Sequence, residues 1–290
     1  MLTADSFWDA VRHCAREALG AGALQPISTR ASIVEDDGLR FIVRISDNLR
    51  RKQQAGGSYR QPHRGNPFLP PDPALTVGAL PPGHVAVLNK FNVLDNHVLV
   101  VTNHFVHQES PLAAADFAAA AVGLAQGGAL AFYNGGRTAG ASQPHRHFQL
   151  VPLPLGSGAD FPTAGLFEDA ADGIDGVERL HFHHVFRRLA ADPGDPDAFG
   201  RACLGAYQKG LSALGLAGAA GLPSRLAAYN LLLTRDWLFI VPRSRELFAD
   251  ISVNGLGYAG SLFVSTPEKL QRVGSTGPMR ILEKVSKPRR

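Results

Sequence analysis

A glycine-rich turn leads directly into an alternating segment in Asn134-Gly-Gly-Arg-Thr-Ala-Gly-Ala-Ser-Gln-Pro-His-Arg-His-Phe-Gln149. We expect residues 145–151 to form a strand, in which side chains point alternately to the two faces of a sheet. His145, His147 and Gln149 then share one face, and the residues between them point the other way. That face therefore presents two imidazoles and an amide next to a turn whose glycines allow a close backbone approach.

His147 is the candidate nucleophile of this segment. A neutral imidazole nitrogen attacks phosphorus without first losing a proton, and its other nitrogen must donate to a fixed acceptor, which sets the tautomer. Gln149 is suited to hydrogen-bond a phosphate or a bridging oxygen without adding negative charge, and His145 is suited to orient the ring or the turn. The pattern indicates transfer of a nucleotidyl group through a covalent histidine adduct.

A metal site is the alternative interpretation of this motif, because His-x-His on one strand face is also a pair of metal ligands. The other histidines that such a site would have to recruit are His84, His97, His104 and His107. A second group at His181, His183 and His184 lacks a glycine-rich turn beside it, and we interpret it as structural or exposed. No third and fourth ligand is evident, so we predict no protein-made metal site.

The turn itself is a candidate phosphate cradle. Gly135, Gly136, Gly140 and Ser142 give a backbone whose amides can point at a phosphate. Asn134 either positions a ribose or phosphate oxygen or caps the turn, and the sequence leaves both roles open.

Cationic side chains must balance a polyphosphate. Those available are Lys52, Lys90, Arg137 and Arg146. Arg146 points away from His147 in a regular strand, so we leave it out of the site. Lys52 belongs to a charged run that is either part of the site or simply solvated, and Asn92 is either a ribose ligand or an ordinary turn residue.

Composition limits the class of protein. The chain has 290 residues, 45% hydrophobic and 19% charged, so a sizeable core is expected. Its net charge of +4 fits a small anionic substrate. A nucleic-acid partner is disfavoured because no basic run is interleaved with aromatic residues. The two distant cysteines exclude a disulfide framework and indicate a reducing cytoplasm.

Neither a signal peptide nor a membrane span is expected from the apolar segments. The most apolar stretch, residues 111–133, is interrupted by Asp116 and Gln126, and we interpret it as an interior helix.

Periodicity predicts an α+β arrangement, with hairpins and helices rather than alternating βαβ units. Helices are predicted over residues 3–20, 113–126 and 196–214. Strands are predicted over residues 27–34, 39–43, 84–90, 97–102, 129–133, 145–151, 179–186, 229–234 and 237–241. Residues 44–73 are predicted to form one long loop, and loops of that length are often functional.

We divide the chain into an N-terminal part over residues 1–155, which holds the His-x-His-x-Gln motif, a flexible linker over residues 156–178, and a C-terminal part over residues 179–290 that completes the site. The linker is predicted from its Gly-Ser-Gly start and its six acidic residues. Residues 92–102 and 230–243 each place an asparagine ahead of an apolar strand, and two related half-barrel units would explain this echo.

The segment Ser142-Gln-Pro-His-Arg-His-Phe-Gln149 resembles the active-site motif of the ATP adenylyltransferases, also called diadenosine tetraphosphate phosphorylases, of the histidine-triad superfamily. In that group glutamine replaces the last histidine of the triad, as Gln149 does here. Other segments that match the family pattern are Asn66-Pro-Phe-Leu-Pro70, Leu88-Asn-Lys-Phe-Asn-Val93, Asn96-His-Val-Leu-Val-Val-Thr102, Tyr229-Asn-Leu-Leu-Leu-Thr234, Val241-Pro-Arg-Ser244, Ile251-Ser-Val-Asn254 and Ala259-Gly-Ser-Leu-Phe263.

The resemblance implies a histidine-triad-like antiparallel sheet with helices, and a reversible reaction in which phosphate cleaves diadenosine tetraphosphate to ATP and ADP. By analogy His147 attacks the α-phosphorus, ATP leaves, and phosphate then attacks the adenylyl-histidine to release ADP. The matching positions expected to hold ribose and phosphates are Lys52, Asn92, Val93, Asn134, Gly140, Ala141, Ser142, Gln143, Gln149, Asn230 and Thr234. No cofactor is implied, although a divalent cation such as Mg²⁺ can travel with the polyphosphate.

Two alternatives remain at this stage. One is a non-catalytic adenine-nucleotide-binding protein of the same fold. The other is a hexose-1-phosphate nucleotidylyltransferase, which shares the covalent chemistry, although the galactose-1-phosphate uridylyltransferase motif ends differently around the second histidine.

Overall fold

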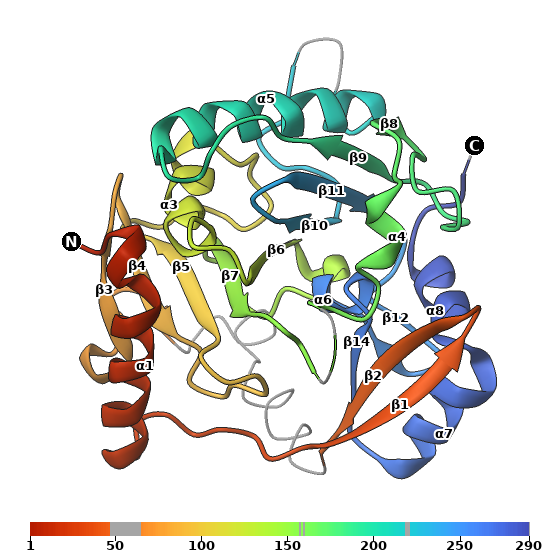
Figure 1. The fold of residues 1–290 in the computed structure, drawn as a ribbon, viewed down its shortest axis with the longest axis horizontal. Coiled ribbons are helices and arrows are strands. Elements are labelled where there is room, and N and C mark those ends of the chain that lie inside the picture. Colours follow the sequence, from red (N-terminus) through yellow and green to blue (C-terminus); the bar gives the residue numbers. More distant parts are fainter. Residues whose placement is uncertain (47–64, 157, 159, 218–220, 290) are drawn as a thin grey trace.

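The computed structural model of the chain describes residues 1–46, 65–156, 158, 160–217 and 221–289. Its centre is a sheet of nine strands that are all antiparallel to their neighbours (Figure 1). In sheet order the strands are β3 (Thr76–Leu80), β4 (His84–Leu88), β5 (Val98–Thr102), β7 (His147–Pro152), β6 (Ala129–Gly135), β10 (Tyr229–Leu233), β11 (Trp237–Pro242), β9 (Val185–Arg188) and β8 (Gly173–Ile174). The predicted α+β class is confirmed.

Both faces of this sheet are buried, so the two-residue period of each strand separates two cores. Tyr133 and Leu231 belong to one core, and Phe132 and Leu232 belong to the other. The strands β6 and β10 meet at the middle of the sheet, where Asn134 is paired with Asn230. In the predicted echo, Asn92 and Asn230 each precede an apolar strand. Of these two asparagines, only Asn230 lies at this central pair.

Three long helices cover the first core: α1 (Ala4–Gly20), α3 (Ala114–Leu124) and α5 (Pro196–Ala213). α1 is amphipathic and buries Phe7 and Val11. α3 is alanine-rich and buried on nearly every side, which is why it lacks a polar face. It packs closely against α5, because a Cβ at Gly200 would lie 2.5 Å from the carbonyl oxygen of Ala114.

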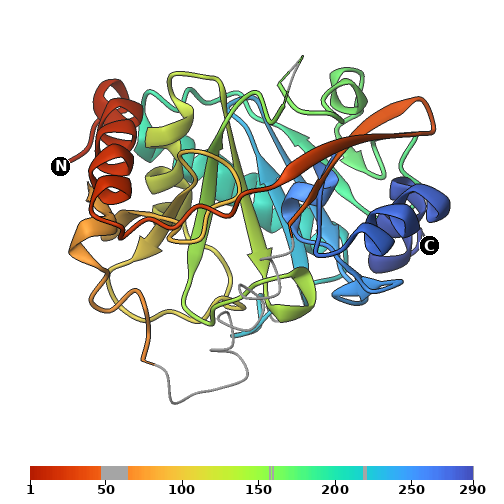
Figure 2. The ribbon, with the colours of Figure 1, turned by 90° about the horizontal axis from the view of Figure 1, so that it is seen from below.

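A second, three-stranded sheet lies over the other core. β1 (Arg30–Asp36) and β2 (Leu39–Ile45) form a hairpin whose turn residues Asp37 and Gly38 both have positive φ, the geometry that matches strand twist. β14 (Ser261–Val264) runs parallel to β2. Figures 1 and 2 both place this N-terminal hairpin beside the C-terminal helices.

Short C-terminal elements complete the second core. They are β12 (Leu247–Phe248), β13 (Ile251–Ser252), α6 (Gly255–Tyr258), α7 (Pro267–Thr276) and α8 (Pro278–Val285). The nine-stranded and the three-stranded sheet each contain strands from both the N-terminal and the C-terminal part of the chain, whereas β12 and β13 pair with each other. The domain boundaries predicted at residues 155 and 179 stay a prediction.

Residues 160–178 differ from the irregular connection that the sequence predicts. They include α4 (Gly165–Glu168) and β8, and Phe161, Leu166 and Phe167 are buried in the second core. The ring of Phe167 stacks on Trp237 at 4.7 Å between centroids. Glycine and acidic residues dominate the composition of this segment, but a few aromatic contacts are enough to fix its path.

The observed strands differ from the predicted ones in three ways. The sequence did not predict β3 and β8 of the central sheet, nor β12, β13 and β14 outside it. In β3, a bulge between Thr76 and Gly78 interrupts the regular register. The strand predicted over residues 179–186 is β9, over Val185–Arg188. β7 begins at His147 rather than at residue 145, because His145 forms an isolated bridge with His107. Among the described residues, no helix is long and apolar enough to span a membrane.

Candidate active site

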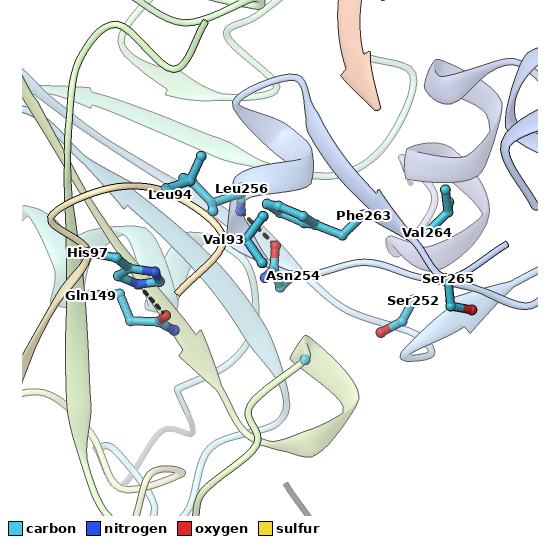
Figure 3. A pocket seen from close by; sticks show the side chains of 11 residues that line it. Val93, Leu94, His97, Gln149, Ser252, Asn254, Leu256, Phe263, Val264 and Ser265 are labelled. Carbon is cyan, nitrogen blue, oxygen red and sulfur yellow. Dashed lines mark hydrogen bonds between the residues drawn. The ribbon is translucent and has the colours of Figure 1, made fainter. Parts of the chain in front are cut away.

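Two cavities adjoin at the glycine-rich turn. The larger has a volume of about 560 Å³ and is lined by His147, Asn134 and Ser142 among others. The smaller has a volume of about 160 Å³ and lies against β13, α6 and β14 (Figure 3). Gly140, Gln149 and Asn254 line both cavities, so the two spaces meet at these residues.

The tautomer of His147 is set by a backbone carbonyl. Its Nδ1–H donates to the carbonyl oxygen of His145 at 2.8 Å, which leaves Nε2 as the ring nitrogen with a free lone pair. Within the described part of the chain, Nε2 has no hydrogen-bond partner, and His147 lines the larger cavity. Burial lowers the pKa of His147 to about 4, so the imidazole is neutral at pH 7.

The His145 ring has a different role. Its Nε2–H donates to the carbonyl oxygen of Thr102 at 3.0 Å, and its Nδ1 accepts from the Asn66 amide at 2.8 Å. Both ring nitrogens are therefore used, and the side chain lines neither cavity. His145 contributes its backbone carbonyl to the site, which accepts the hydrogen bond from His147 Nδ1–H. The fixed ring of His145 holds this backbone in place. The aromatic ring of Phe68 packs against both imidazoles at 5.6 Å.

Gln149 is oriented by a chain of hydrogen bonds. The Asn89 amide donates to His97 Nδ1 at 3.2 Å, which makes His97 Nε2 the protonated nitrogen. That Nε2–H lies 3.0 Å from Gln149 Oε1, as the dashed line in Figure 3 shows. Because the oxygen of Gln149 faces His97, its NH₂ group is left to donate to a ligand between the two cavities.

The glycine-rich turn is more strongly folded onto itself than the sequence predicts. A 3₁₀ turn over Arg137–Ala139 follows Gly136, and the amide of Ala141 donates to the Gly136 carbonyl at 3.1 Å. Ala141 lines neither cavity, whereas Ser142 and Gln143 line the larger one. Asn134 at the start of the segment and Gly140 also line the larger cavity beside His147, whereas Gly135 and Gly136 line neither cavity.

Gly140 lets the C-terminal part of the chain reach the site. Its φ is +89°, and a Cβ there would lie 2.9 Å from Asn254 Cβ and 3.0 Å from the Val253 carbonyl oxygen. A side chain at this position is excluded on both counts. Asn254 caps α6 by accepting from the Leu256 amide at 3.1 Å, and the same residue lines both cavities.

A buried polar network lies behind the turn. Asn134 Oδ1 accepts from Asn230 Nδ2 and from the Gly255 amide, both at 2.8 Å. Asn230 Oδ1 in turn accepts from Arg243 at 2.5 Å, and Arg243 also donates to the Val253 carbonyl at 2.9 Å. Asn134 lines the larger cavity, whereas Asn230 lies one layer behind it.

Four other predicted residues have varied positions. Val93 lines the smaller cavity. Asn92 is buried and donates to the Leu94 carbonyl at 2.9 Å, as a turn residue does. Thr234 lies at the other end of β10, where its hydroxyl accepts from the amides of Asp236 and Trp237, so the structure does not bring it to the cavities. Lys52 lies outside the described residues.

The remaining cations and the alternative metal site can also be located. Lys90 lines the larger cavity. Arg146 points to the opposite face and pairs with buried Asp116 at 2.9 Å, as the alternation predicts, and Asp116 also bonds His84 at 3.0 Å. Across the described ranges, no three histidine, cysteine or acidic residues are grouped so as to hold a metal ion.

Comparison with known proteins matches successive parts of the chain to two domain families. The profile of the Ap4A phosphorylase N-terminal domain matches residues 1–169, and that of the ATP adenylyltransferase C-terminal domain matches residues 178–288. The chain belongs to the Ap4A phosphorylase family. This family member is 30% identical over 238 residues to diadenosine 5',5'''-P1,P4-tetraphosphate phosphorylase 2 of Saccharomyces cerevisiae, which covers 72% of this chain and 71% of that protein.

Two further comparisons cover nearly the whole family member. It is 26% identical over 288 residues to protein APA1 of the same yeast, which covers 89% of this chain and 86% of the relative. The structure of yeast Ap4A phosphorylase Apa2 in complex with AMP has a TM-score of 0.78 at 24% identity, over 98% of this chain and 97% of the yeast chain. At 24% identity, the likeness to the Apa2 structure shows the fold alone.

Several residues of this phosphorylase-family site were not among the predicted site residues: Asn66, Asn89, His97, Gln108, Arg243 and Asn254. Most of them lie inside segments that match the family pattern, which was the available signal for all but Gln108. Their roles depend on contacts between distant segments, and neither periodicity nor spacing reports such contacts.

Proposed function

We propose that this protein catalyses the reversible phosphorolysis of diadenosine tetraphosphate to ATP and ADP through an adenylyl-histidine on His147. Family membership supports the reaction class. One yeast relative is named a diadenosine tetraphosphate phosphorylase, and two structures of yeast Ap4A phosphorylase Apa2 are complexes with AMP and with Ap4A. The residues around the cavities supply the chemistry that this reaction needs.

One observation carries the proposal. The Nδ1–H of His147 is bound to the carbonyl of His145 at 2.8 Å, and the opposite ring nitrogen belongs to a side chain that lines the larger cavity. A neutral imidazole with its proton on the far nitrogen is the nucleophilic form of histidine. The low pKa keeps that form populated at pH 7 without a separate base.

In the first half-reaction, His147 Nε2 attacks the α-phosphorus of diadenosine tetraphosphate. An N–P bond forms, the bond from phosphorus to the bridging oxygen breaks, and ATP leaves with that oxygen. The ring then carries positive charge, and the His145 carbonyl stabilises it through the Nδ1–H. No proton transfer to the leaving group is needed, because a nucleoside polyphosphate leaves as an anion.

In the second half-reaction, an oxygen of inorganic phosphate attacks the adenylyl phosphorus. The N–P bond breaks, the electron pair returns to Nε2, and ADP is released with His147 neutral again. Gln149 is placed to donate its NH₂ group to the oxygens that gain charge in both steps, because His97 holds its carbonyl end. The Ser142 end of the turn lines the same cavity.

The two cavities accommodate the two ends of the substrate. The larger one has an apolar wall that includes Phe68, Leu75 and Leu88, which suits a purine base. The smaller one begins at Gln149, and in this proposal it receives the nucleotide that departs. Magnesium ions enter with the polyphosphate in this proposal, since their oxygen ligands come from the phosphates.

Product analysis tests this function. The protein is incubated with diadenosine tetraphosphate with and without inorganic phosphate, and the products are separated by anion-exchange chromatography. We expect equal amounts of ATP and ADP, formed only with phosphate. Nucleotide binding without turnover would instead indicate a binding protein. Hydrolysis in the absence of phosphate, which gives either two molecules of ADP or one AMP and one ATP, would indicate a hydrolase.

A further inference from the structure

The strands that carry Asn134 and His147 separate at their shared edge. The ladder between β6 and β7 ends at the pair of Phe132 with Gln149. Beyond it, Asn134 is paired only on its outer side with β10, and His147 is paired only on its outer side with β5. The sheet is therefore open between the two residues that line the larger cavity.

The side-chain amide of Gln108 fills this opening. Its Oε1 accepts from the backbone N–H of His147 at 2.9 Å, and its Nε2 donates to the backbone carbonyl of Asn134 at 2.9 Å and to that of His147 at 3.3 Å. The orientation of the amide is fixed, because an N–H group needs its oxygen and the carbonyl groups need its NH₂. One side chain thus replaces the ladder hydrogen bonds that the opening removes.

The backbone of Gln108 is anchored on β6 and on the turn that precedes β7. Its amide donates to the Pro144 carbonyl at 2.7 Å, and its carbonyl accepts from the Tyr133 hydroxyl at 2.5 Å. The Gln108 side chain is 0% exposed and lines neither cavity. It has no route to a substrate except through the backbone groups that it holds.

We propose that Gln108 is a positioning residue for the reaction at His147. It holds the separated strand ends at the distance that places the imidazole in the cavity, with Nε2 facing the substrate. This inference rests on the proposed function. A displacement of about 1 Å in a reacting group costs on the order of 10²-fold in rate, so loss of this bridge should act on the chemical step.

Substitution of Gln108 tests the inference. Gln108→Met keeps the length of the side chain and removes its hydrogen bonds, and Gln108→Asn keeps an amide that is one methylene too short to bridge both strands. For each folded variant we expect kcat to fall about 10²-fold. The Kd for AMP, measured by calorimetry, should change less than about threefold, because Gln108 does not contact the ligand.

Thr163→Val is the matched control, because Thr163 is also buried and its hydroxyl donates to the Tyr258 carbonyl at 2.8 Å, away from both cavities. This variant should lose stability but keep kcat. If Gln108→Met or Gln108→Asn keeps wild-type kcat, or loses AMP binding in parallel with kcat, the positioning role is wrong. If the wild-type protein makes no ATP and ADP, the proposed function fails instead.

Discussion

Two buried histidines, His147 and His184, share the same hydrogen bond at Nδ1 and differ at the second ring nitrogen. Each donates its Nδ1–H to the backbone carbonyl two residues earlier at 2.8 Å, and burial lowers the pKa of each to about 4. At His184, the Val177 amide donates to Nε2 at 3.0 Å. At His147, no described residue donates to Nε2, and the side chain lines a cavity.

This difference teaches what separates a nucleophile from a structural histidine. Burial and a carbonyl partner make both rings neutral and fix the same tautomer. Only the absence of a donor at the second nitrogen leaves a lone pair for a phosphorus atom. The charged neighbours also differ, because Asp175 and Arg289 affect the His184 pKa, whereas the causes at His147 are burial, a carbonyl and the neighbouring imidazole.

The largest expected effect comes from removing the two rings in turn. His147→Asn should lower kcat by on the order of 10⁴-fold or more, because the covalent route is lost. His184→Asn should leave the kcat of the folded enzyme within about threefold of wild type, since both hydrogen bonds of that ring are structural. Steady-state ATP formation measures both. Wild-type turnover by His147→Asn, with AMP binding intact, would remove the basis of the comparison.

Gln149 is the hydrogen-bond donor beside His147, the catalytic histidine of the pair. Gln149→Ala should lower kcat about 10²-fold, because one donor to the developing charge is lost. His97→Phe should lower it about tenfold by releasing the amide, and should cause no further loss in the Gln149→Ala background, since it acts through that residue. Single-turnover rates of the four proteins form the cycle. Additive losses would show that His97 acts by another route.

The pH dependence of stability should be alike for the two histidines. Both pKa values are lowered in the folded protein, so the unfolded chain binds protons more readily, and the free energy of unfolding rises with pH between about 4 and 6.5. Each ring should contribute about 2 kcal/mol of the stability lost between pH 7 and pH 5. Urea unfolding of His147→Asn and His184→Asn at both pH values should show this loss reduced equally. If the pH-dependent loss of stability were reduced in only one of the two variants, the two histidines would not be electrostatically alike.

The smallest effect is expected at Thr234, which the family pattern assigned to the substrate. Its hydroxyl caps the turn after β10 at the end away from Asn230. Thr234→Ala should leave kcat and KM unchanged and lower the free energy of unfolding by about 1 kcal/mol. Thermal unfolding and steady-state kinetics measure the two quantities. A tenfold rise in KM would place Thr234 in the substrate site after all.

The comparison also shows how far the sequence could lead. His147 was predictable, because alternation and an adjacent glycine-rich turn are local signals. His184 stands in an equally local cluster, but its partner Val177 is supplied by the folding of residues 160–178, whose glycine and acidic content hides the buried Phe161 and Phe167.

Long-range contacts account for the rest of what the sequence did not predict. Asn254 reaches the site only because Gly140 permits a close approach across more than 100 residues of chain. Asn230 was assigned to the substrate by its motif and instead supports Asn134 from behind. The three long helices and the central strands were predictable because they follow clear periodicity.

The most direct test of the central claim is a rapid-quench experiment without phosphate. Wild-type protein is mixed with diadenosine tetraphosphate labelled at the α-phosphorus, quenched in base and mapped by mass spectrometry. The expected result is one adenylyl group per chain on His147 and none on His184, with a bond stable to base and labile to acid. A parallel reaction with phosphate checks that the same preparation forms ATP and ADP. If it does, and His147 carries no label at any quench time without phosphate, the covalent mechanism is contradicted.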